Sequence, residues 1–343
     1  MNRSKHVAIV GGGIAGMESA KCLSREGYRI TLVEKEKTVG GHVAQWSHLF
    51  PDFSDPAPIL TDLSSCMDTD NVKIITNTKI TGIEKKTHFH LKAGDELSIT
   101  ADAVLITAGF HVFDATRKEE YGYGLFRNVI TSVDLEQKFK KDKKITTASG
   151  NVPRRIAIIH CVGSRDAKSG NTYCSKVCCI TGVKQAIEIS KRLPETEVYC
   201  FYMDLRLYGS RFDELYLRAQ KQHNIQFIRG RLSEAAEKPD HSLQIKAEDT
   251  LSGRPLRMNV NMIVLLVGME PSDSIKDFAG DGLLEINENG FLQPENIHAA
   301  RNRTGQPGIF IAGACICPMS VNDTLENARS AALEVSAYLK EIL

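Results

Sequence analysis

The sequence predicts an α/β fold with two Rossmann-like domains, and three observations lead to this prediction. A short apolar strand near the N-terminus, His6–Val10, runs into a glycine-rich turn and then a helix. A second apolar strand, Arg155–His160, begins near the middle of the chain, and a third, Gly308–Ile311, precedes a long C-terminal helix. Buried strands that alternate with helices are typical of parallel sheets covered by helices.

The composition limits the function classes. The chain has 343 residues, 42% of them apolar and 25% charged, which is enough for two or three domains with cores of their own. A net charge of +1 implies no broad attraction to nucleic acid or to an anionic membrane. The longest strongly apolar stretch, Met262–Met269, is far shorter than the roughly 20 residues of a membrane span, and the N-terminus has no signal-peptide pattern. We therefore expect a cytoplasmic protein that binds neither nucleic acid nor a membrane.

The first strand leads into a nucleotide-binding fingerprint. Gly11, Gly13 and Gly16 have the Gly-x-Gly-x-x-Gly spacing, in which the glycines permit a tight turn and the helix N-terminus receives a pyrophosphate. The next strand, Arg29–Val33, ends in Glu34, an acid placed for ribose hydroxyls. Strand, turn, helix, strand and acid in this order predict a dinucleotide site.

Two further motifs favour FAD over NAD at this site. Gly40-Gly41 follows the acid, as in FAD enzymes where the chain loops back along the pyrophosphate. The predicted strand Asp102–Ile106 leads into Thr107-Ala108-Gly109, which resembles the Ala-Thr-Gly motif of flavoproteins of the glutathione reductase type.

The C-terminal region resembles the second FAD motif of the same flavoproteins. Ala312-Gly313-Ala314 follows the third strand, with Ala314 where an aspartate is usual. A helix is expected over 324–342, with Asn322 or Asp323 as its cap. The fold prediction is therefore two Rossmann-like dinucleotide-binding domains of the glutathione/thioredoxin-reductase type.

A cysteine motif occupies the place of a second glycine fingerprint. After the strand Arg155–His160, four of the nine cysteines lie within 19 residues. Their spacing is Cys161-x12-Cys174-x3-Cys178-Cys179, on a loop and at the start of a helix expected over 175–193. Four thiolates match the ligand set of a [4Fe–4S] cubane. Only one glycine, Gly163, stands in this turn, so we expect no NAD(P)H in the second domain, which is instead adapted to carry an iron–sulfur cluster.

Other interpretations of the cysteines remain open at this point. Structural zinc usually takes paired cysteines two to four residues apart, which adjacent Cys178 and Cys179 fit poorly. A dithiol redox site would use C-x-x-C, a pattern absent from the sequence. A role in core packing alone is disfavoured for these four cysteines, because the loop between them is polar and rich in turn-forming residues. Cys315 and Cys317 form a separate pair with either a packing role or a thiol role near the flavin.

These residues resemble a known family. Cys-Val-Gly-Ser-Arg-Asp (161–166) and Tyr-Cys-Ser-Lys-Val-Cys-Cys (173–179) resemble the signature of the HdrA family of heterodisulfide reductase subunits, over nearly the whole chain. The short length and missing ferredoxin-like cysteine runs most resemble the member found in the sulfur-oxidising heterodisulfide-reductase-like complex. That resemblance implies an electron-transfer oxidoreductase subunit in the oxidation of sulfane sulfur to sulfite, although the isolated chain need not turn over a substrate. The alternatives are an NAD(P)H-dependent FAD disulfide reductase and the related subunit of a quinone-interacting complex.

The resemblance also implies cofactors, partners and roles. The cofactors would be FAD and a [4Fe–4S] cluster, and the partners a second copy of the chain and other iron–sulfur subunits. Lys184 matches a family lysine close to the flavin ring, and its alternative role is that of a solvated helix lysine. The predicted FAD contacts are Gly11, Gly13, Gly16, Glu34, Lys35, Gly41, His42, Ile80, Ala108, Gly109, Gly313, Asp323 and Thr324.

The predicted FAD-binding domain is discontinuous. Its two halves are 1–115 and 271–343. Residues 116–149 are expected to connect it to the inserted cluster-bearing domain, 150–270.

Overall fold

The computed structural model describes residues 5–65, 67, 69–93, 97–280 and 282–342. The chain divides into two compact units. Unit 1 comprises 1–44, 56–111 and 270–343, and unit 2 comprises 45–55 and 112–269. Each unit has a parallel sheet of its own, which confirms the predicted pair of Rossmann-like α/β domains.

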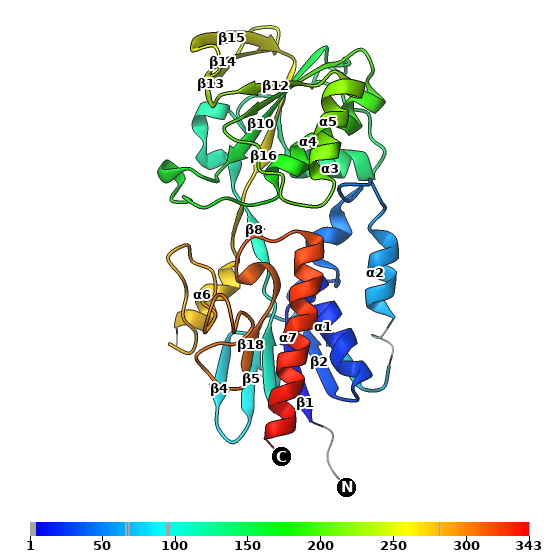
Figure 1. The fold of residues 1–343 in the computed structure, drawn as a ribbon, viewed down its shortest axis with the longest axis vertical. Helices are drawn as coiled ribbons and strands as arrows, with labels where there is room; N and C mark the ends of the chain where they lie inside the picture. Colours follow the sequence, from blue (N-terminus) through cyan, green and yellow to red (C-terminus); the bar gives the residue numbers. More distant parts are fainter. Residues whose placement is uncertain (1–4, 66, 68, 94–96, 281, 343) are drawn as a thin grey trace. The chain divides into compact units, whose positions relative to one another are not determined.

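Unit 1 contains a five-stranded parallel sheet in the order β18-β7-β1-β2-β3. Its strands are β1 (His6–Val10), β2 (Arg29–Val33), β3 (Val72–Ile75), β7 (Ala103–Ile106) and β18 (Ile309–Ile311). The chain therefore brings its first and last strands into one sheet, as the two FAD motifs predict. Helix α1 (Ile14–Arg25) packs side by side with α7 (Val321–Glu341) (Figure 1), and the hydroxyl of Ser19 donates to the carbonyl of Ala328 at 3.1 Å.

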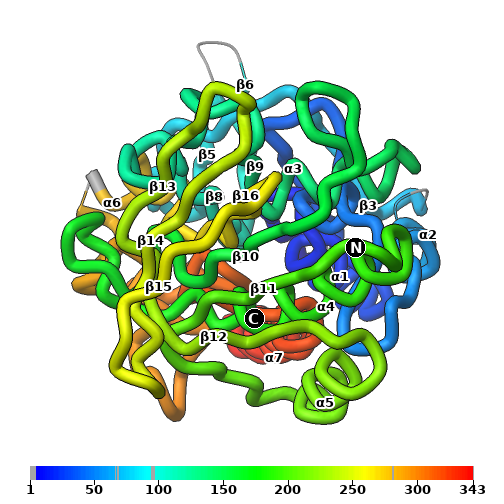
Figure 2. Tube along the Cα trace, turned by 90° about the horizontal axis from the view of Figure 1, so that it is seen from above, coloured from blue at the N-terminus to red at the C-terminus, as the bar shows by residue number. Residues whose placement is uncertain are grey.

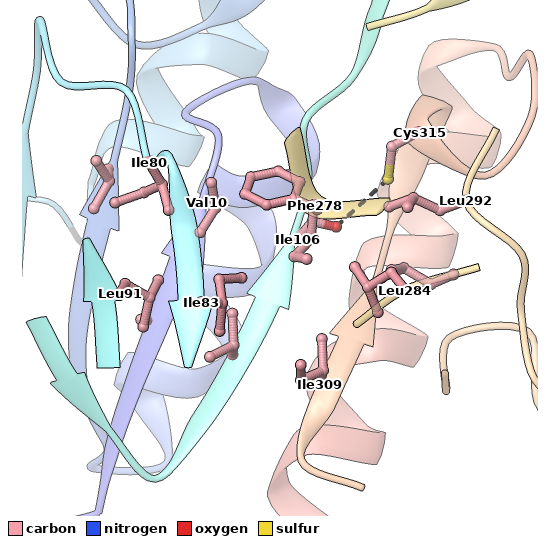
Figure 3. Close-up of a cluster of buried hydrophobic side chains, with 14 of the residues drawn as sticks. Val10, Ile80, Ile83, Leu91, Ile106, Phe278, Leu284, Leu292, Ile309 and Cys315 are labelled. Atoms are coloured by element: carbon pink, nitrogen blue, oxygen red, sulfur yellow. Dashed lines mark hydrogen bonds between the residues drawn. The ribbon is translucent and has the colours of Figure 1, made fainter. Parts of the chain in front are cut away.

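The remaining elements of unit 1 complete its core. Strands β4 (Gly82–Lys85), β5 (Phe89–Ala93) and β6 (Leu97–Ala101) form an antiparallel sheet, and the helices α2 (Ala57–Ser64) and α6 (Asp273–Gly280) complete the unit. Figure 3 shows side chains of β4 and β5 in one apolar cluster with residues of β1, β7, α6 and β18. The alternating burial of β5, with Phe89, Leu91 and Ala93 buried, is typical of a strand with one face on the core.

Unit 2 repeats the parallel sheet, in the order β12-β11-β10-β16-β9. Its strands are β9 (Val129–Thr131), β10 (Arg155–Val162), β11 (Glu197–Tyr202), β12 (Gln226–Arg229) and β16 (Met262–Val267). Its helices are α3 (Ser132–Lys140), α4 (Cys178–Arg192) and α5 (Phe212–His223). The antiparallel strands β13 (Leu232–Glu237), β14 (Leu243–Asp249) and β15 (Arg254–Val260) run side by side (Figure 2).

The units differ from the predicted domain boundaries in two segments. Residues 45–55 belong to unit 2, although the chain before and after them belongs to unit 1. The expected connecting segment, 116–149, contributes β9 and α3 to unit 2, because Val129 pairs with Ile263 of β16. Where the chain passes between the units, β8 (Phe110–Val112) pairs with β17 (Met269–Pro271). In the described part of the chain, every helix is too short or too polar to cross a membrane.

Candidate functional site

The glycine turn of unit 1 is too tight for any side chain at two positions. Gly11 has φ +115°, and a Cβ there would lie 2.3 Å from the carbonyl oxygen of Thr107. A Cβ on Gly16 would lie 2.0 Å from the carbonyl oxygen of Gly11. The hydroxyl of Thr107 also donates to that Gly11 oxygen at 2.8 Å, so the end of β7 holds the turn in place. Thr107, the first residue of the motif at 107–109, is therefore a positioning residue, although it was not among the predicted FAD contacts.

The third glycine leaves space for a ligand. A Cβ on Gly13 would meet no described atom within 4 Å, and Gly13 is the extended N-cap of α1. Among the described residues, no side chain caps α1, so its first backbone N–H groups can donate to an anion. The loop at Gly40 pairs beside Gly13 and donates its N–H to the Gly12 oxygen at 2.8 Å. This arrangement fits a pyrophosphate group.

The acid at the end of β2 is held against the turn. Glu34 is buried, and its carboxylate accepts hydrogen bonds from the backbone N–H of Gly12 at 2.5 Å and of Glu36 at 2.8 Å. Each oxygen keeps a second lone pair that can accept a ribose hydroxyl. Lys35 is exposed beside it. Glu34 therefore stands where the dinucleotide fingerprint requires an acceptor.

His42 lies in the loop that returns from the double glycine, Gly40-Gly41. A Cβ on Gly41, which has φ +57°, would lie 3.1 Å from the Cα of Gly13. The imidazole of His42 stacks on Phe110 with centroids 4.3 Å apart, and its Nε2 lies 3.1 Å from the Phe110 oxygen. Burial lowers the pKa of His42, so the neutral ring is favoured. Ala108 and Gly109 lie between the end of β7 and Phe110, and a Cβ on Gly109 would meet no described atom within 4 Å.

The C-terminal motif is anchored by a residue that the sequence motifs did not single out. Gly313 has φ +78°, and a Cβ there would lie 2.8 Å from the Cβ of Ala15 on α1. The side-chain oxygen of Asn327 accepts the N–H of Gly313 at 2.8 Å. Asn327 lies one helical turn after Thr324, so its position on that face of α7 is the signal that could have identified it.

The predicted cap of the last helix is wrong. Ser320, not Asn322 or Asp323, is the N-cap of α7, and its hydroxyl accepts the N–H of Asp323 at 3.2 Å. The carboxylate of Asp323 in turn accepts the N–H of Ser320 at 3.1 Å, completing a capping box. The helix starts earlier than expected because this box satisfies its first N–H groups. Thr324 is buried and donates its hydroxyl to the Ser320 oxygen at 2.7 Å.

Ile80, a predicted FAD contact, and Cys315, whose role the sequence left open, both lie in the core of unit 1. Ile80 is 2% exposed and packs in the apolar cluster with Val10 and Ile83 (Figure 3), so its contact with FAD stays a prediction. Cys315 is fully buried in the same cluster, and its thiol donates to the Ile106 oxygen at 3.5 Å (Figure 3). Burial raises the pKa of Cys315 to about 12. Cys315 is therefore a packing residue, whereas the half-buried Cys317 accepts a hydrogen bond from Arg301 at 3.0 Å.

We expect alkylation to separate these two cysteines. In the folded protein, iodoacetamide at neutral pH should modify Cys317 and leave Cys315 unmodified, because the Cys315 thiol is buried and protonated. Both cysteines lie on one tryptic peptide, 304–329, and fragmentation of this peptide by tandem mass spectrometry assigns the modified residue. Modification of both in urea would control for peptide detection, and equal modification in the folded protein would contradict a packing role for Cys315.

The four motif cysteines of unit 2 gather around a loop between β10 and α4. Cys161 ends the regular part of β10, where the strand register shifts, and Cys178 and Cys179 form the first turn of α4. The helix begins three residues later than predicted, and Cys174 lies in the loop before it, as expected. The backbone N–H of Lys176 donates to the Cys174 sulfur at 3.3 Å, a contact that helps to orient this side chain.

This loop contains strained backbone. Cys161, Arg165 and Lys176 have φ of 58°, 53° and 62°, in the left-handed region that costs non-glycine residues free energy. The loop is held by the side-chain amide of Asn171, which donates to the Gly163 oxygen at 3.0 Å. Such conformations persist where the surroundings impose them and are concentrated at functional sites. The strain falls on the cysteine motif itself.

The electrostatics of the thiols fit a bound cationic centre. Burial raises the pKa of Cys161 to about 12, and the charges of Cys179 and Cys174 raise it as well. Burial raises the pKa of Cys178 strongly, as do the charges of Cys161, Cys179 and Cys174. Burial also raises the pKa of Cys179, so bound iron would be needed to hold Cys161, Cys178 and Cys179 ionised. Over the described ranges, no group of three or more His, Cys, Asp or Glu side chains is spaced to hold a metal ion.

An aromatic ring packs directly on the single glycine of the turn after β10. Gly163 has φ +71°, and a Cβ there would lie 2.1 Å from the ring of Phe113. An aromatic side chain therefore packs where a second glycine fingerprint would receive its nucleotide. The expected absence of NAD(P)H from the second domain stays a prediction.

Lys184 lies on α4, five residues after Cys179. It is 2% exposed, so the alternative of a solvated helix lysine is wrong. Its ammonium pairs with Glu136 of α3, lies 3.4 Å from Glu188, and donates to the His48 oxygen at 2.9 Å. The long side chain is buried because these three acceptors compensate its charge. Its role close to a flavin stays a prediction.

Removal of one partner from this buried pair should be costly. We expect Glu136→Ala to lower the free energy of unfolding by about 3–5 kcal/mol, because it leaves the charge of Lys184 buried without its closest carboxylate. Urea unfolding followed by circular dichroism measures the change. Glu195→Ala removes an exposed carboxylate of the same unit and should change stability by only about 0.5 kcal/mol. Equal effects of the two substitutions would contradict the importance of the buried pair.

Comparison with known proteins agrees with this geometry. The family described as pyridine nucleotide-disulphide oxidoreductase matches residues 5–334. The iron-sulfur A-subunit of the CoB–CoM heterodisulfide reductase of Methanocaldococcus jannaschii is 31% identical, over 97% of this chain and 64% of its own length. The A-subunit of the H(2)/formate:CoB-CoM heterodisulfide, ferredoxin reductase of Methanococcus maripaludis is 30% identical, over 98% of this chain and 64% of its own length. The chain thus spans about 64% of the length of these relatives.

Solved structures show the same fold at lower identity. Thioredoxin reductase of T. acidophilum matches with a TM-score of 0.67 and 19% identity, over the full length of both chains. Thioredoxin reductase of Lactococcus lactis matches with a TM-score of 0.68 and 18% identity, over 98% of this chain and 100% of its own. Both similarities concern the fold alone, a pair of nucleotide-binding-type α/β domains.

Proposed function

Because this chain belongs to the pyridine nucleotide-disulphide oxidoreductase family and is therefore an oxidoreductase, we propose that it is an electron-transfer subunit with FAD on unit 1 and a [4Fe–4S] cluster on unit 2. A flavin exchanges electrons in pairs or singly, and a cubane cluster exchanges them one at a time. The two cofactors together would link two-electron to one-electron chemistry. The observation that carries this proposal is the group of four mutually interacting thiols around the strained loop between β10 and α4.

The residues of unit 1 would bind and orient FAD. The N–H groups at the start of α1 would donate to the pyrophosphate. The missing side chain of Gly13 leaves room for it, because a Cβ there would meet no described atom within 4 Å. Glu34 would accept hydrogen bonds from the ribose hydroxyls. The N-terminal end of α7, ordered by Ser320 and Asp323, carries a partial positive charge that would favour an anionic group nearby.

The residues of unit 2 would hold the cluster. Cys161, Cys174, Cys178 and Cys179 would each ligate one iron. The N–H that Lys176 donates to Cys174 orients that ligand before any iron is bound. Apolar packing of Cys178 in the core around α4 would keep water from one side of the site.

The assembly and pathway belong to the same proposal. The relatives named above are subunits of heterodisulfide reductases, and we infer that this chain works with other iron–sulfur subunits and as a homodimer. The resemblance to the short sulfur-oxidising form supports a cytoplasmic role in the oxidation of sulfane sulfur to sulfite. The related subunit of a quinone-interacting complex is the nearest alternative of the same class.

Anaerobic purification tests the proposal. About four iron, about four acid-labile sulfide and one FAD per chain, with a cluster EPR signal after dithionite reduction, are the expected results. Zinc or no metal in the purified protein would exclude the cluster. Rapid bleaching of the flavin by NADH would favour the alternative, an NAD(P)H-dependent disulfide reductase, and little bleaching is expected because Phe113 fills the second turn.

A further inference from the structure

One nitrogen of the Arg165 side chain is buried without a hydrogen-bond partner. Arg165 belongs to the strained loop between β10 and α4, four residues after Cys161. One end of its guanidinium, Nη2, donates to the carboxylate of Asp204 at 2.7 Å. The other end, Nη1, is buried and has no partner among the described residues. Nearly every buried donor in a folded protein has an acceptor, so Nη1 indicates an acceptor that the described part of the chain does not supply.

The loop after β11 places this side chain beside the cysteine motif. Asp204 follows β11, and its carboxylate holds Arg165. The backbone oxygen of the same Asp204 accepts a hydrogen bond from the thiol of Cys179 at 3.6 Å. One residue therefore contacts both the guanidinium and a motif cysteine, and all three residues belong to unit 2. The Arg165 guanidinium is thereby fixed next to the cysteine motif.

The charge of Arg165 acts on two thiols of the motif. Burial raises the pKa of Cys161 to about 12 and also raises the pKa of Cys179, and the guanidinium of Arg165 opposes both rises. A cation acts in this way when it lies near a thiol and favours the thiolate. The charge of Arg206 acts in the same direction on both thiols. Because Arg165 is only 21% exposed, water screens its charge only in part.

We propose that Nη1 of Arg165 donates a hydrogen bond to a sulfur of the iron–sulfur centre held by the four cysteines, and that Asp204 positions Arg165 for this contact. This contact rests on the proposed function, because the iron–sulfur centre supplies the acceptor. A guanidinium donates in a rigid planar fork, so the bond from Nη2 to Asp204 also sets the direction of Nη1.

Such a contact would raise the reduction potential of the centre. Reduction adds one electron and no proton to the site, so the reduced centre is more negative than the oxidised one. A cationic donor stabilises the more negative form more strongly, and hydrogen bonds to the sulfurs are among the factors that set iron–sulfur potentials. Arg165 keeps its proton throughout, because a guanidinium does not lose its proton in a folded protein.

An EPR-monitored redox titration of the anaerobically purified protein tests the effect on the potential. Arg165→Gln should lower the ratio of reduced to oxidised centre at a given potential about tenfold, which is about 59 mV for one electron. Arg229→Gln is the matched control, because the Arg229 guanidinium donates to the other oxygen of Asp204 at 3.3 Å but is 46% exposed. Screening by water should keep its effect below about twofold. Equal shifts in the two variants would attribute the effect to the ion pairs of Asp204 and overturn the contact.

A second measurement detects the contact in the unsubstituted protein. Pulsed EPR of the reduced protein, produced with ¹⁵N-labelled arginine, should show a ¹⁵N hyperfine coupling to the centre. This coupling should be absent in Arg165→Gln and present in Arg229→Gln. A coupling that persists in Arg165→Gln would assign the contact to another arginine, such as Arg206, and would overturn the inference. Purified protein without iron would refute the proposed function, whereas iron-loaded protein without the coupling would refute only the role of Arg165.

Discussion

Replacement of Cys178 by alanine is expected to reduce iron from about four per chain to nearly none and to abolish the cluster EPR signal. Cys178 is 6% exposed in the first turn of α4, and its charge interacts with those of the three other motif cysteines. The alanine would remove one of the four proposed ligands. Burial raises the pKa of Cys161 and of Cys179, so these two thiols favour the protonated form without iron, and partial binding by three cysteines is disfavoured.

The measurement combines iron and sulfide analysis with EPR on anaerobically purified protein. FAD content should be retained, because the glycine turn and Glu34 belong to unit 1. Cys315→Ala is the matched control, since it truncates an equally buried cysteine outside the motif and should keep its iron. Full iron with an unchanged EPR signal in Cys178→Ala would remove this residue from the ligand set. Loss of iron in both variants would point to a general loss of structure instead.

Replacement of Gly16 by alanine should have the largest effect on unit 1. Its Cβ would lie 2.0 Å from the Gly11 oxygen, a backbone atom that cannot move away without opening the turn. Such overpacking costs about 1–3 kcal/mol of unfolding free energy, and the displaced turn should no longer bind FAD. Flavin absorbance of the purified protein and urea unfolding measure the two effects.

Gly13→Ala separates FAD binding from stability. Gly13 has φ −71°, which suits alanine, and its Cβ would meet no protein atom within 4 Å. We expect stability within about 0.5 kcal/mol of the parent protein but FAD affinity lower by about tenfold, or about 1.4 kcal/mol, because the methyl group enters the pyrophosphate space. Unchanged FAD affinity in Gly13→Ala would show that the space in front of α1 is not the pyrophosphate site.

The sequence by itself determined the parts of this protein that depend on neighbours along the chain. The turn from β1 to α1 was predictable because the spacing of Gly11, Gly13 and Gly16 matches a local backbone geometry. The cysteine motif was recognisable for the same reason, since its four cysteines lie within 19 residues. Strands β1 and β2 were predicted at their observed bounds from short apolar runs between turn residues.

Only the tertiary structure decided the features that join distant segments. His48 and Glu188 are 140 positions apart, and no local pattern indicates that Glu188 contacts the His48 ring or that Lys184 donates to the His48 carbonyl. The same holds for Asn327 of α7, whose side-chain oxygen accepts the N–H of Gly313. It also holds for Cys315, which is buried among side chains from both halves of unit 1. Burial and charge compensation depend on the whole fold, because they sum contacts from several elements. Turns and the spacing of a motif depend only on a few consecutive residues.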